Sequence, residues 1–485
     1  MKLKLTIRQI FFIVLFLGLF LMTLRPIGDP DFWWHLRTGL LIVETRAIPH
    51  TDPFSFTKAG SPWITHEWLS ELLIYGLFKL GGYGLLIFFF SLIITGAFLL
   101  VYVRCPSETR PYVAGFVLLL GAVSTAPTWG VRPQMISLFI TCLFLYLLNR
   151  YRREDGLKFI IPLPLITVVW VNLHAGYLTG IALIGIYIIG GLGEILMAEL
   201  HLGEKAGSIP TFKSILSLCG ILGACVLAAL VNPNGIQIII YPFQTLTSPA
   251  MQQFIQEWFS PDFHQTVWQP LAWLILALIG FGMLSKKSIS PTNILLTLIF
   301  GYAALLSMRN EPFFAITAIP VLAEQIGSLV KIRSDNRSPG RLLRLVVPIL
   351  LVSIVLLTGL RFVQVVQEQP KTEAENFPKA AVDWLLENKP KGNLFNSYGW
   401  GGYLIWRIYP EYQVYIDGRA DVYGDAFIYN YVSIYHAEPG WEDKLKKQAV
   451  ETILVESDAP LSNVLRQSPS WRIAYEDKTS IIFTH

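Results

Sequence analysis

Two aspartates and a histidine near the N-terminus have the spacing of a small reactive site. Asp29 and Asp31 flank a proline, and His35 follows Asp31 by four residues. We expect residues 32–45 to form a short helix along the membrane surface, with Trp33 and Trp34 in the headgroup region. Asp31 and His35 then lie one turn apart on the same face of this helix. Such a group could bind a divalent cation, Mg²⁺ or Mn²⁺, through the two carboxylates, or it could supply a general base. The structural alternative makes Asp31 a helix N-cap and Asp29 part of a turn.

Other polar residues stand at the ends of long apolar segments, where ionisable groups are costly and often mark a substrate path or a catalytic site. His66 and Glu67 precede one such segment. The later members are Arg132, Asn172, His174, Asn232, Asn234, Arg309 and Glu311. Each also has a structural alternative. His66 and Glu67 could open a helix, the arginines could reach toward water or close ion pairs, and the asparagines and His174 could make interhelical hydrogen bonds or turns.

The elements that would position these residues are membrane helices. Hydrophobic residues make up 53% of the 485 positions and charged residues only 15%, whereas an ordinary soluble domain has roughly 25% charged residues. A bilayer core about 30 Å thick requires around 20 apolar residues per helix. We therefore predict a polytopic α-helical membrane protein with about eleven spanning helices, near residues 10–25, 83–103, 111–128, 134–149, 159–172, 175–195, 214–231, 268–284, 292–308, 312–330 and 344–361.

Basic residues in the connecting loops predict the orientation. One set of alternate loops holds eighteen lysines and arginines, and the opposite set holds seven. The positive-inside rule then places the N-terminus in the cytoplasm and the C-terminus outside the cell (plasma or inner) membrane. In this orientation nearly all the polar residues named above fall on the exterior side. The net charge of +4 is small and the basic residues form no continuous patch, so no nucleic-acid partner is indicated.

Two domains are expected from the change in composition along the chain. Residues 1–365 form the transmembrane domain, with a long exterior first loop at residues 26–66. Residues 366–485 contain no apolar segment long enough to span, and they alternate helical and strand patterns, with strands expected at 393–396, 413–416, 452–455 and 480–483. This predicts an exterior soluble α/β domain. Its glycine-rich stretch after the first strand lacks the dinucleotide spacing, so no nucleotide cofactor is expected.

The layout resembles that of the GT-C superfamily of integral membrane glycosyltransferases, which use polyprenyl-phosphate-linked sugar donors. The resemblance consists of one span, a long exterior loop opening with the acidic motif Asp29-Pro30-Asp31, many further spans and an exterior C-terminal domain. Protein mannosyltransferases, oligosaccharyltransferases and lipid A aminoarabinose transferases belong to this superfamily. A poorly characterised bacterial branch is the most similar, through Gly28 to His35, His66-Glu67-Trp68, Arg132-Pro133-Gln134, Asn232-Pro233-Asn234-Gly235 and Asp417-Gly418-Arg419.

The resemblance implies an inverting sugar transfer on the exterior face, to an acceptor that is a glycan, a lipid or a protein. Arg132 or Arg309 would hold the donor phosphate, since a guanidinium matches phosphate geometry. Asp29 or Asp31 would take the acceptor proton, or would hold a cation that offsets the leaving phosphate. The remaining candidates would orient the acceptor, a metal or the substrate: His35, His66, Glu67, Asn172, His174, Asn232, Asn234 and Glu311.

Two other functions are consistent with a polytopic chain. A transporter or lipid flippase would be expected to show inverted repeats and broken or charged helices near the bilayer midplane, and the sequence shows no convincing repeat. A non-catalytic scaffold that displays the C-terminal domain would leave the acidic first loop unexplained.

Overall fold

The computed structural model describes residues 5–201, 209–330 and 341–485 of the chain. These residues form two compact units. The first contains the N-terminal 25 residues and the segments 87–235 and 257–365, and the second contains residues 26–86, 236–256 and 366–485. The second unit therefore combines the first loop with the C-terminal segment.

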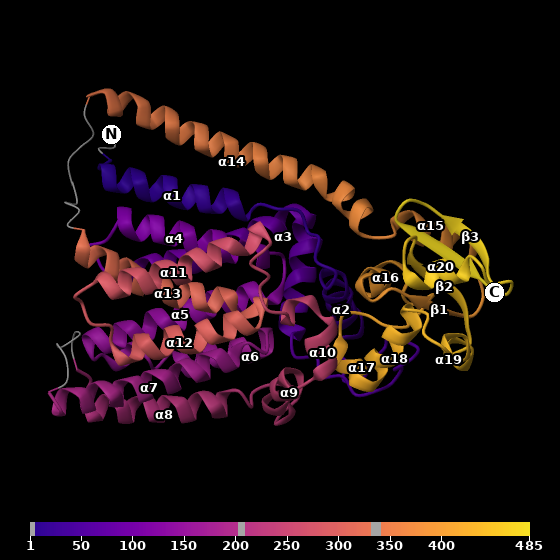
Figure 1. Ribbon diagram of the computed structural model, residues 1–485, viewed down its shortest axis with the longest axis horizontal. Helices are drawn as coiled ribbons and strands as arrows, with labels where there is room; N and C mark the ends of the chain where they lie inside the picture. The colour runs from indigo at the N-terminus through magenta and orange to yellow at the C-terminus, as the bar shows by residue number, and fades with distance from the viewer. Residues whose placement is uncertain (1–4, 202–208, 331–340) are drawn as a thin grey trace. The chain divides into compact units, whose positions relative to one another are not determined.

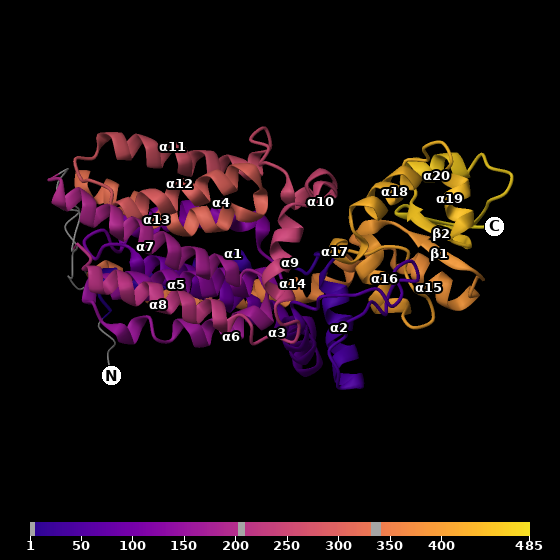
Figure 2. The same ribbon diagram turned by 90° about the horizontal axis from the view of Figure 1, so that it is seen from below.

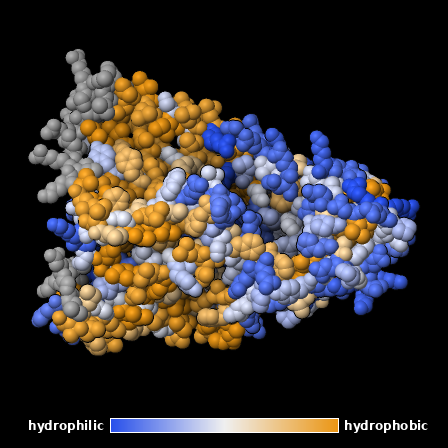
Figure 3. All heavy atoms as spheres, in the orientation of Figure 1, coloured by the Kyte–Doolittle hydropathy of each residue, from blue (hydrophilic) through white to orange (hydrophobic). Residues whose placement is uncertain are grey.

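The first unit is a bundle of apolar helices (Figures 1 and 2). Its helices are α1 (Ile7–Thr23), the part of α3 (Trp68–Arg104) from residue 87 onward, α4 (Tyr112–Thr125), α5 (Pro133–Glu154), α6 (Leu163–Leu173), α7 (Tyr177–Glu199), α8 (Phe212–Ala228), α11 (Gln269–Leu284), α12 (Pro291–Leu306), α13 (Glu311–Leu329) and the first part of α14 (Arg341–Asn376). Helix α13 packs against α4, α11 and α12, and α7 packs against α8 and α12. Many large apolar side chains on these helices face outward, as Figure 3 shows over much of this unit.

Length and composition identify the spanning segments. Within the described residues, six helices are long and apolar enough to cross a bilayer, and five shorter apolar helices accompany them. Each of the predicted spans coincides with one of these helices, because an uninterrupted apolar segment of about 20 residues has few other stable arrangements. The chain is a multi-pass integral membrane protein, and the predicted fold class is confirmed. The predicted 83–103 span begins just beyond a break in α3, where Gly82 has φ +59°.

The C-terminal part of the second unit is a small mixed sheet with helices. The strand order is β1 (Asn393–Asn396), β2 (Val450–Glu456), β4 (Ser480–Thr484), β3 (Arg472–Glu476). Strands β1 and β2 are parallel, and the other two pairs are antiparallel, with Ile453 opposite both Phe395 and Phe483. The helices around the sheet are α15 (Lys379–Asn388), α16 (Gly401–Ile408), α17 (Ala420–Tyr423), α18 (Asp425–Tyr435), α19 (Trp441–Lys447) and α20 (Pro460–Leu465).

The predicted strand at residues 413–416 is wrong. This segment pairs with the first loop instead of the sheet, through an isolated parallel bridge between Ser55 and Val414. The Val414 amide donates to Phe54 O, and Val414 O accepts from the Phe56 amide. The alternating pattern correctly indicated extended backbone, but its partner lies far away in the sequence.

Helix α2 (Phe32–Thr45) exists as predicted, but its surroundings differ from the expectation of a helix lying on the membrane surface. It packs against α16, and Trp33 and Trp34 are buried. The Trp33 ring lies 5.0 Å from the Tyr403 ring and 5.5 Å from the Phe377 ring. The two tryptophans are therefore core residues of the second unit, and their interpretation as headgroup anchors is wrong. The short helices α9 (Gln237–Leu246) and α10 (Pro249–Phe254) complete this unit, with Ser248 hydrogen-bonded to Asp425.

Candidate functional site

A buried cluster of histidines and carboxylates lies where α2 meets the start of α3. His35 Nε2 lies 3.5 Å from Glu67 Oε2, and His35 Nδ1 lies 3.7 Å from Glu71 Oε1. On the other side, His66 Nε2 lies 3.5 Å from Glu67 Oε1. Glu67 and Glu71 are four residues apart, and the Glu71 amide donates to Glu67 O, so both carboxylates point to the same face. The structure thus brings together the predicted residues His35, His66 and Glu67.

Charge in this cluster favours protonated histidines. Burial alone would lower the pKa of His35, but Glu67 and Glu71 outweigh it and raise the pKa. For His66 the same competition raises the pKa to about 9, with Glu67 and Asp421 as the acidic neighbours. Burial raises the pKa of Asp421 in turn. The His66 ring also lies against the Tyr241 ring at 4.4 Å.

Asp31 borders this cluster through Trp34. Its Oδ1 accepts a hydrogen bond from Trp34 Nε1 at 3.1 Å, and the Trp34 indole lies 3.7 Å from the His35 ring. Asp31 is the residue before α2, but its side chain makes no capping hydrogen bond, so its interpretation as an N-cap is wrong. Asp29 does form the expected turn, because its Oδ1 accepts from the Asp31 amide at 3.0 Å. The Asp31 carboxylate is therefore held by an indole and not by the helix backbone.

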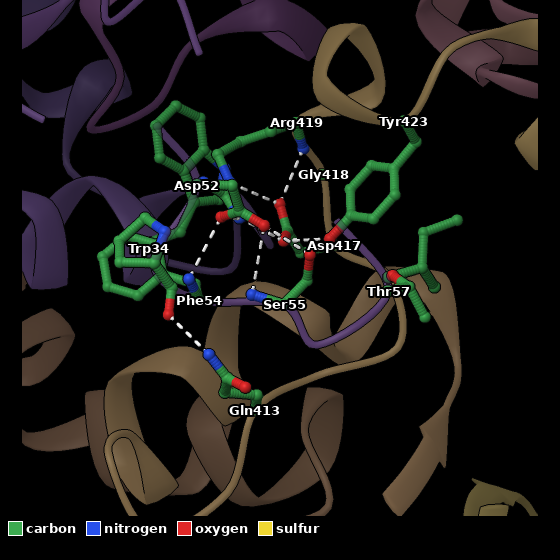
Figure 4. A network of polar contacts seen from close by, with 12 residues as sticks. Trp34, Asp52, Phe54, Ser55, Thr57, Gln413, Asp417, Gly418, Arg419 and Tyr423 are labelled. Carbon is green, nitrogen blue, oxygen red and sulfur yellow. Dashed lines mark hydrogen bonds and ion pairs between the residues drawn. The ribbon is translucent and has the colours of Figure 1, made fainter. Parts of the chain in front are cut away.

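A second polar network joins the first loop to the C-terminal segment (Figure 4). Arg419 Nη2 lies 2.8 Å from Asp52 Oδ1 and 2.7 Å from Asp417 Oδ2. Tyr423 Oη donates to Asp417 Oδ2 at 2.6 Å, and Ser55 Oγ donates to the Asp52 carboxylate. Arg419, Asp52 and Asp417 are all nearly inaccessible to solvent. Burial alone would raise the pKa of Asp417, but the adjacent guanidinium outweighs it and lowers the pKa.

Sequence reasoning missed part of both groups. Glu71 carries a detectable signal, because it follows Glu67 by one helical turn. Asp417 and Arg419 belong to a motif of the similar GT-C branch, but the sequence by itself assigns them no role. Asp421 has no local sequence signal, since its place beside His66 depends on the folding of two distant segments.

The two predicted phosphate-binding arginines of the first unit meet one short segment. Arg132 Nη1 lies 2.5 Å from Glu257 Oε1, and the Arg309 guanidinium lies over the Trp258 ring at 4.7 Å. Burial alone would raise the pKa of Glu257, but Arg132 outweighs it and lowers the pKa. A carboxylate thus occupies a position on Arg132 that a phosphate oxygen could take.

Four of the other five predicted substrate-binding residues take part in internal hydrogen bonds. Asn232 Nδ2 donates to Asn172 Oδ1 at 3.2 Å, and Asn232 Oδ1 accepts from the Asn234 amide at 2.9 Å. His174 Nδ1 accepts from the Gly176 amide at 2.8 Å and lies 2.8 Å from Ser137 Oγ. Glu311 is fully buried at the start of α13. These contacts match the structural alternatives for the asparagines and His174, and a substrate-binding role for these four residues and for Glu311 stays a prediction.

The described residues contain no group of three or more histidine, cysteine, aspartate or glutamate side chains arranged to hold a metal ion. Asp29 and Asp31 could still contribute two carboxylates, because Mg²⁺ often combines one or two carboxylates with water and substrate phosphate oxygens. The predicted Mg²⁺ or Mn²⁺ site stays a prediction.

Solved structures provide the deciding comparison. The archaeal oligosaccharyltransferase AglB from Archaeoglobus fulgidus, in complex with an inhibitory peptide and a dolichol-phosphate, superposes with a TM-score of 0.53 at 12% sequence identity, over 91% of this chain and 69% of AglB. This chain has a GT-C glycosyltransferase fold. The mycobacterial arabinofuranosyltransferase AftD is similar over 97% of this chain and 41% of its own length, with 13% identity and a TM-score of 0.51. ArnT from Cupriavidus metallidurans bound to undecaprenyl phosphate covers 97% of both chains at 12% identity, with a TM-score of 0.49.

Sequence comparison adds nothing to this likeness. No protein-family model matches the chain, and no curated protein matches it. Because the sequence identity to these solved structures is only 12–13%, the GT-C fold is established by shape alone.

Proposed function

We propose that the chain is a membrane glycosyltransferase that moves a sugar from a polyprenyl-phosphate-linked donor to an acceptor on the exterior face of the membrane. The observation that carries the proposal is the GT-C fold shared with AglB, whose solved structure contains a dolichol-phosphate. The acidic first loop and the start of α3 support it, because together they supply the buried cluster of His35, His66, Glu67 and Glu71 and the adjacent Asp31.

Asp31 is the proposed general base. Its carboxylate takes the proton from the acceptor group as that group attacks the anomeric carbon of the donor sugar. The bond between the anomeric carbon and the phosphate oxygen breaks, the configuration inverts, and polyprenyl phosphate leaves. The Trp34 N–H holds one carboxylate oxygen, so the proton is taken in a defined direction. The His35 ring of the buried cluster lies against the Trp34 indole and so supports the ring that holds this oxygen.

Arg132 and Arg309 are the proposed ligands of the donor phosphate. Arg132 already binds a carboxylate, that of Glu257, and a phosphate oxygen would replace it. Glu257 would keep the arginine oriented while no donor is bound. This gives Glu257 the role of a competitor for the phosphate site.

The orientation remains as the loop charges predict, with the N-terminus in the cytoplasm and residues 366–485 on the exterior side. This segment is proposed to be the exterior soluble domain, and residues 1–365 are proposed to be the membrane domain.

The proposal is tested with the purified protein in liposomes that contain a polyprenyl-phosphate-linked sugar labelled in the sugar. A panel of donors with hexose and pentose headgroups is incubated with cell-envelope acceptor fractions, and the label that leaves the lipid-phosphate fraction is measured. We expect label to move to the acceptor fraction with at least one donor. If the protein instead moves the intact lipid-linked sugar across the bilayer without breaking its phosphate bond, it is a flippase and the proposal is wrong.

A further inference from the structure

The C-terminal segment lies directly against the Asp29-Pro30-Asp31 turn at two glycines, Gly418 and Gly402. A methyl group added at Gly418 would overlap Asp31 Oδ1 and would come 3.4 Å from Trp34 Nε1. A methyl group added at Gly402, on α16, would come 2.5 Å from the carbonyl oxygen of Pro30. Both positions therefore place bare backbone against the turn that carries the proposed base. No side chain larger than hydrogen fits at Gly418 while Asp31 keeps its hydrogen bond to Trp34.

The turn that contains Gly418 is held rigidly. The Asp417 carboxylate accepts from Arg419 Nε at 2.8 Å and from the Arg419 amide at 2.9 Å, which closes the turn around Gly418. Tyr423 Oη donates to the same carboxylate. Tyr398 Oη donates to the Gly418 carbonyl at 3.3 Å. Buried charge-assisted hydrogen bonds of this kind rigidify a segment when their members are paired.

The same turn is fastened to the first loop. The Arg419 guanidinium pairs with Asp52 and lies over the Trp63 ring at 4.5 Å and the Phe54 ring at 5.0 Å. The first loop thus contacts this turn at two places. Asp52 binds Arg419, and Asp31 lies against Gly418. Figure 4 shows Asp52, Arg419 and Asp417 together with Gly418 and Trp34.

We propose that the Asp417-Gly418-Arg419 turn is a positioning element for the base Asp31, so that the C-terminal segment is part of the catalytic site. This inference rests on the proposed function of Asp31. Gly418 fixes where the Asp31 carboxylate can lie, and Arg419 fixes Gly418 through Asp417 and Asp52. A misplaced base costs rate even when it is still present, because proton transfer requires hydrogen-bond distance to the acceptor.

Gly418→Ala tests the inference, with Gly399→Ala as the matched control. Gly399 belongs to the same segment, and a methyl group there would meet nothing within 4 Å. Gly418→Ala is expected to lower kcat for sugar transfer by about 10²-fold, with the donor KM changed less than about threefold. Gly399→Ala is expected to keep wild-type values. The comparison requires a preparation in which the wild type transfers sugar and Asp31→Asn does not. If Gly418→Ala has a normal kcat in that preparation, the inference is overturned and the proposed function still stands.

A stability cycle tests the contact without any activity. Asp31→Ala removes the atoms that the Gly418 methyl group would overlap, so Gly418→Ala is expected to lower Tm in the wild-type background and to lower it much less in the Asp31→Ala background. If Gly418→Ala alone fails to fold, recovery of folded protein in the double variant supports the contact, and failure to recover overturns it. Equal losses of Tm in both backgrounds overturn it as well. A coupled cycle in a protein that transfers no sugar from any donor would contradict the proposed function, and with it the positioning role, while the contact itself would remain.

Discussion

Arg419 Nη2 lies 2.8 Å from Asp52 Oδ1, so the C-terminal segment and the first loop share a fully buried ion pair. The same guanidinium also binds Asp417. One cation thus compensates two carboxylates that are shielded from water. Loss of this single positive charge should therefore lower the stability of the folded protein strongly.

Replacement of Arg419 by Met is expected to destabilise the protein by about 3–5 kcal/mol, because Asp52 and Asp417 would then be buried without a counter-charge. Thermal unfolding in detergent, followed by the fluorescence of the tryptophans, measures the change. The control is Arg466→Met, which removes a half-exposed pair with Glu476 and should cost less than about 1 kcal/mol. Equal losses for the two variants would show that the Arg419 network adds no more to stability than a surface pair.

His66 should make stability depend on alkaline pH. Its pKa rises from 6.5 to about 9 because Glu67 and Asp421 outweigh burial. A histidine whose pKa is raised on folding stabilises the folded state fully below pH 6.5, progressively less between pH 6.5 and 9, and not at all above pH 9. The loss amounts to about 3 kcal/mol at most. The Tm of the wild type should therefore fall more steeply from pH 7 to pH 10 than that of His66→Gln. Parallel Tm curves would refute the assignment.

The positions of the membrane helices could be predicted because each one depends on a local run of apolar residues. The pairing of Asp31 with Trp34 could also be anticipated in part, as could the shared face of Glu67 and Glu71, since both follow helical spacing. Contacts between distant segments could not. Nothing in the residues around Trp33 shows that Tyr403 will cover it, so the sequence favours a headgroup anchor where the structure has a buried aromatic contact.

The same limit applies to the polar network at Arg419. An Asp-Gly-Arg sequence is compatible with an exposed turn, and only the fold shows that Asp52 meets its arginine. The prediction of a sheet strand at residues 413–416 was wrong for a related reason. The sequence of an extended segment does not show whether the segment pairs with a sheet or with a single loop.

Glu257 should compete with the donor for Arg132. Glu257→Gln removes the charge that pairs with this arginine, so the donor KM is expected to fall several-fold. Arg132→Ala and Arg309→Ala should raise the donor KM by about 10-fold or more, with a smaller effect on kcat. Arg150→Ala, which breaks a half-exposed pair with Glu154, serves as the control and should change neither constant. A donor KM that does not respond to Glu257→Gln or to either arginine would place the phosphate elsewhere.

The proposed orientation predicts the side on which the C-terminal segment can be labelled. In a variant without the native cysteines Cys105, Cys142, Cys219 and Cys225, a cysteine introduced by Ser457→Cys should react with a membrane-impermeant maleimide in intact cells. A cysteine introduced by Ser288→Cys, in a loop predicted to be cytoplasmic, should react only after permeabilisation. The reverse pattern would invert the topology and remove the exterior site.

The most direct test of the central claim is the rate of sugar transfer by Asp31→Asn, measured with the reconstituted protein and a donor that the wild type uses. Asparagine keeps the size of the side chain and can still accept the hydrogen bond from Trp34, but it cannot take a proton from the acceptor. We expect the rate to fall by about 10²-fold or more, without a change in Tm beyond about 2 °C. Asp29→Asn keeps the turn through its amide oxygen and should lose less than about 10-fold. Transfer by Asp31→Asn at the wild-type rate would contradict the account.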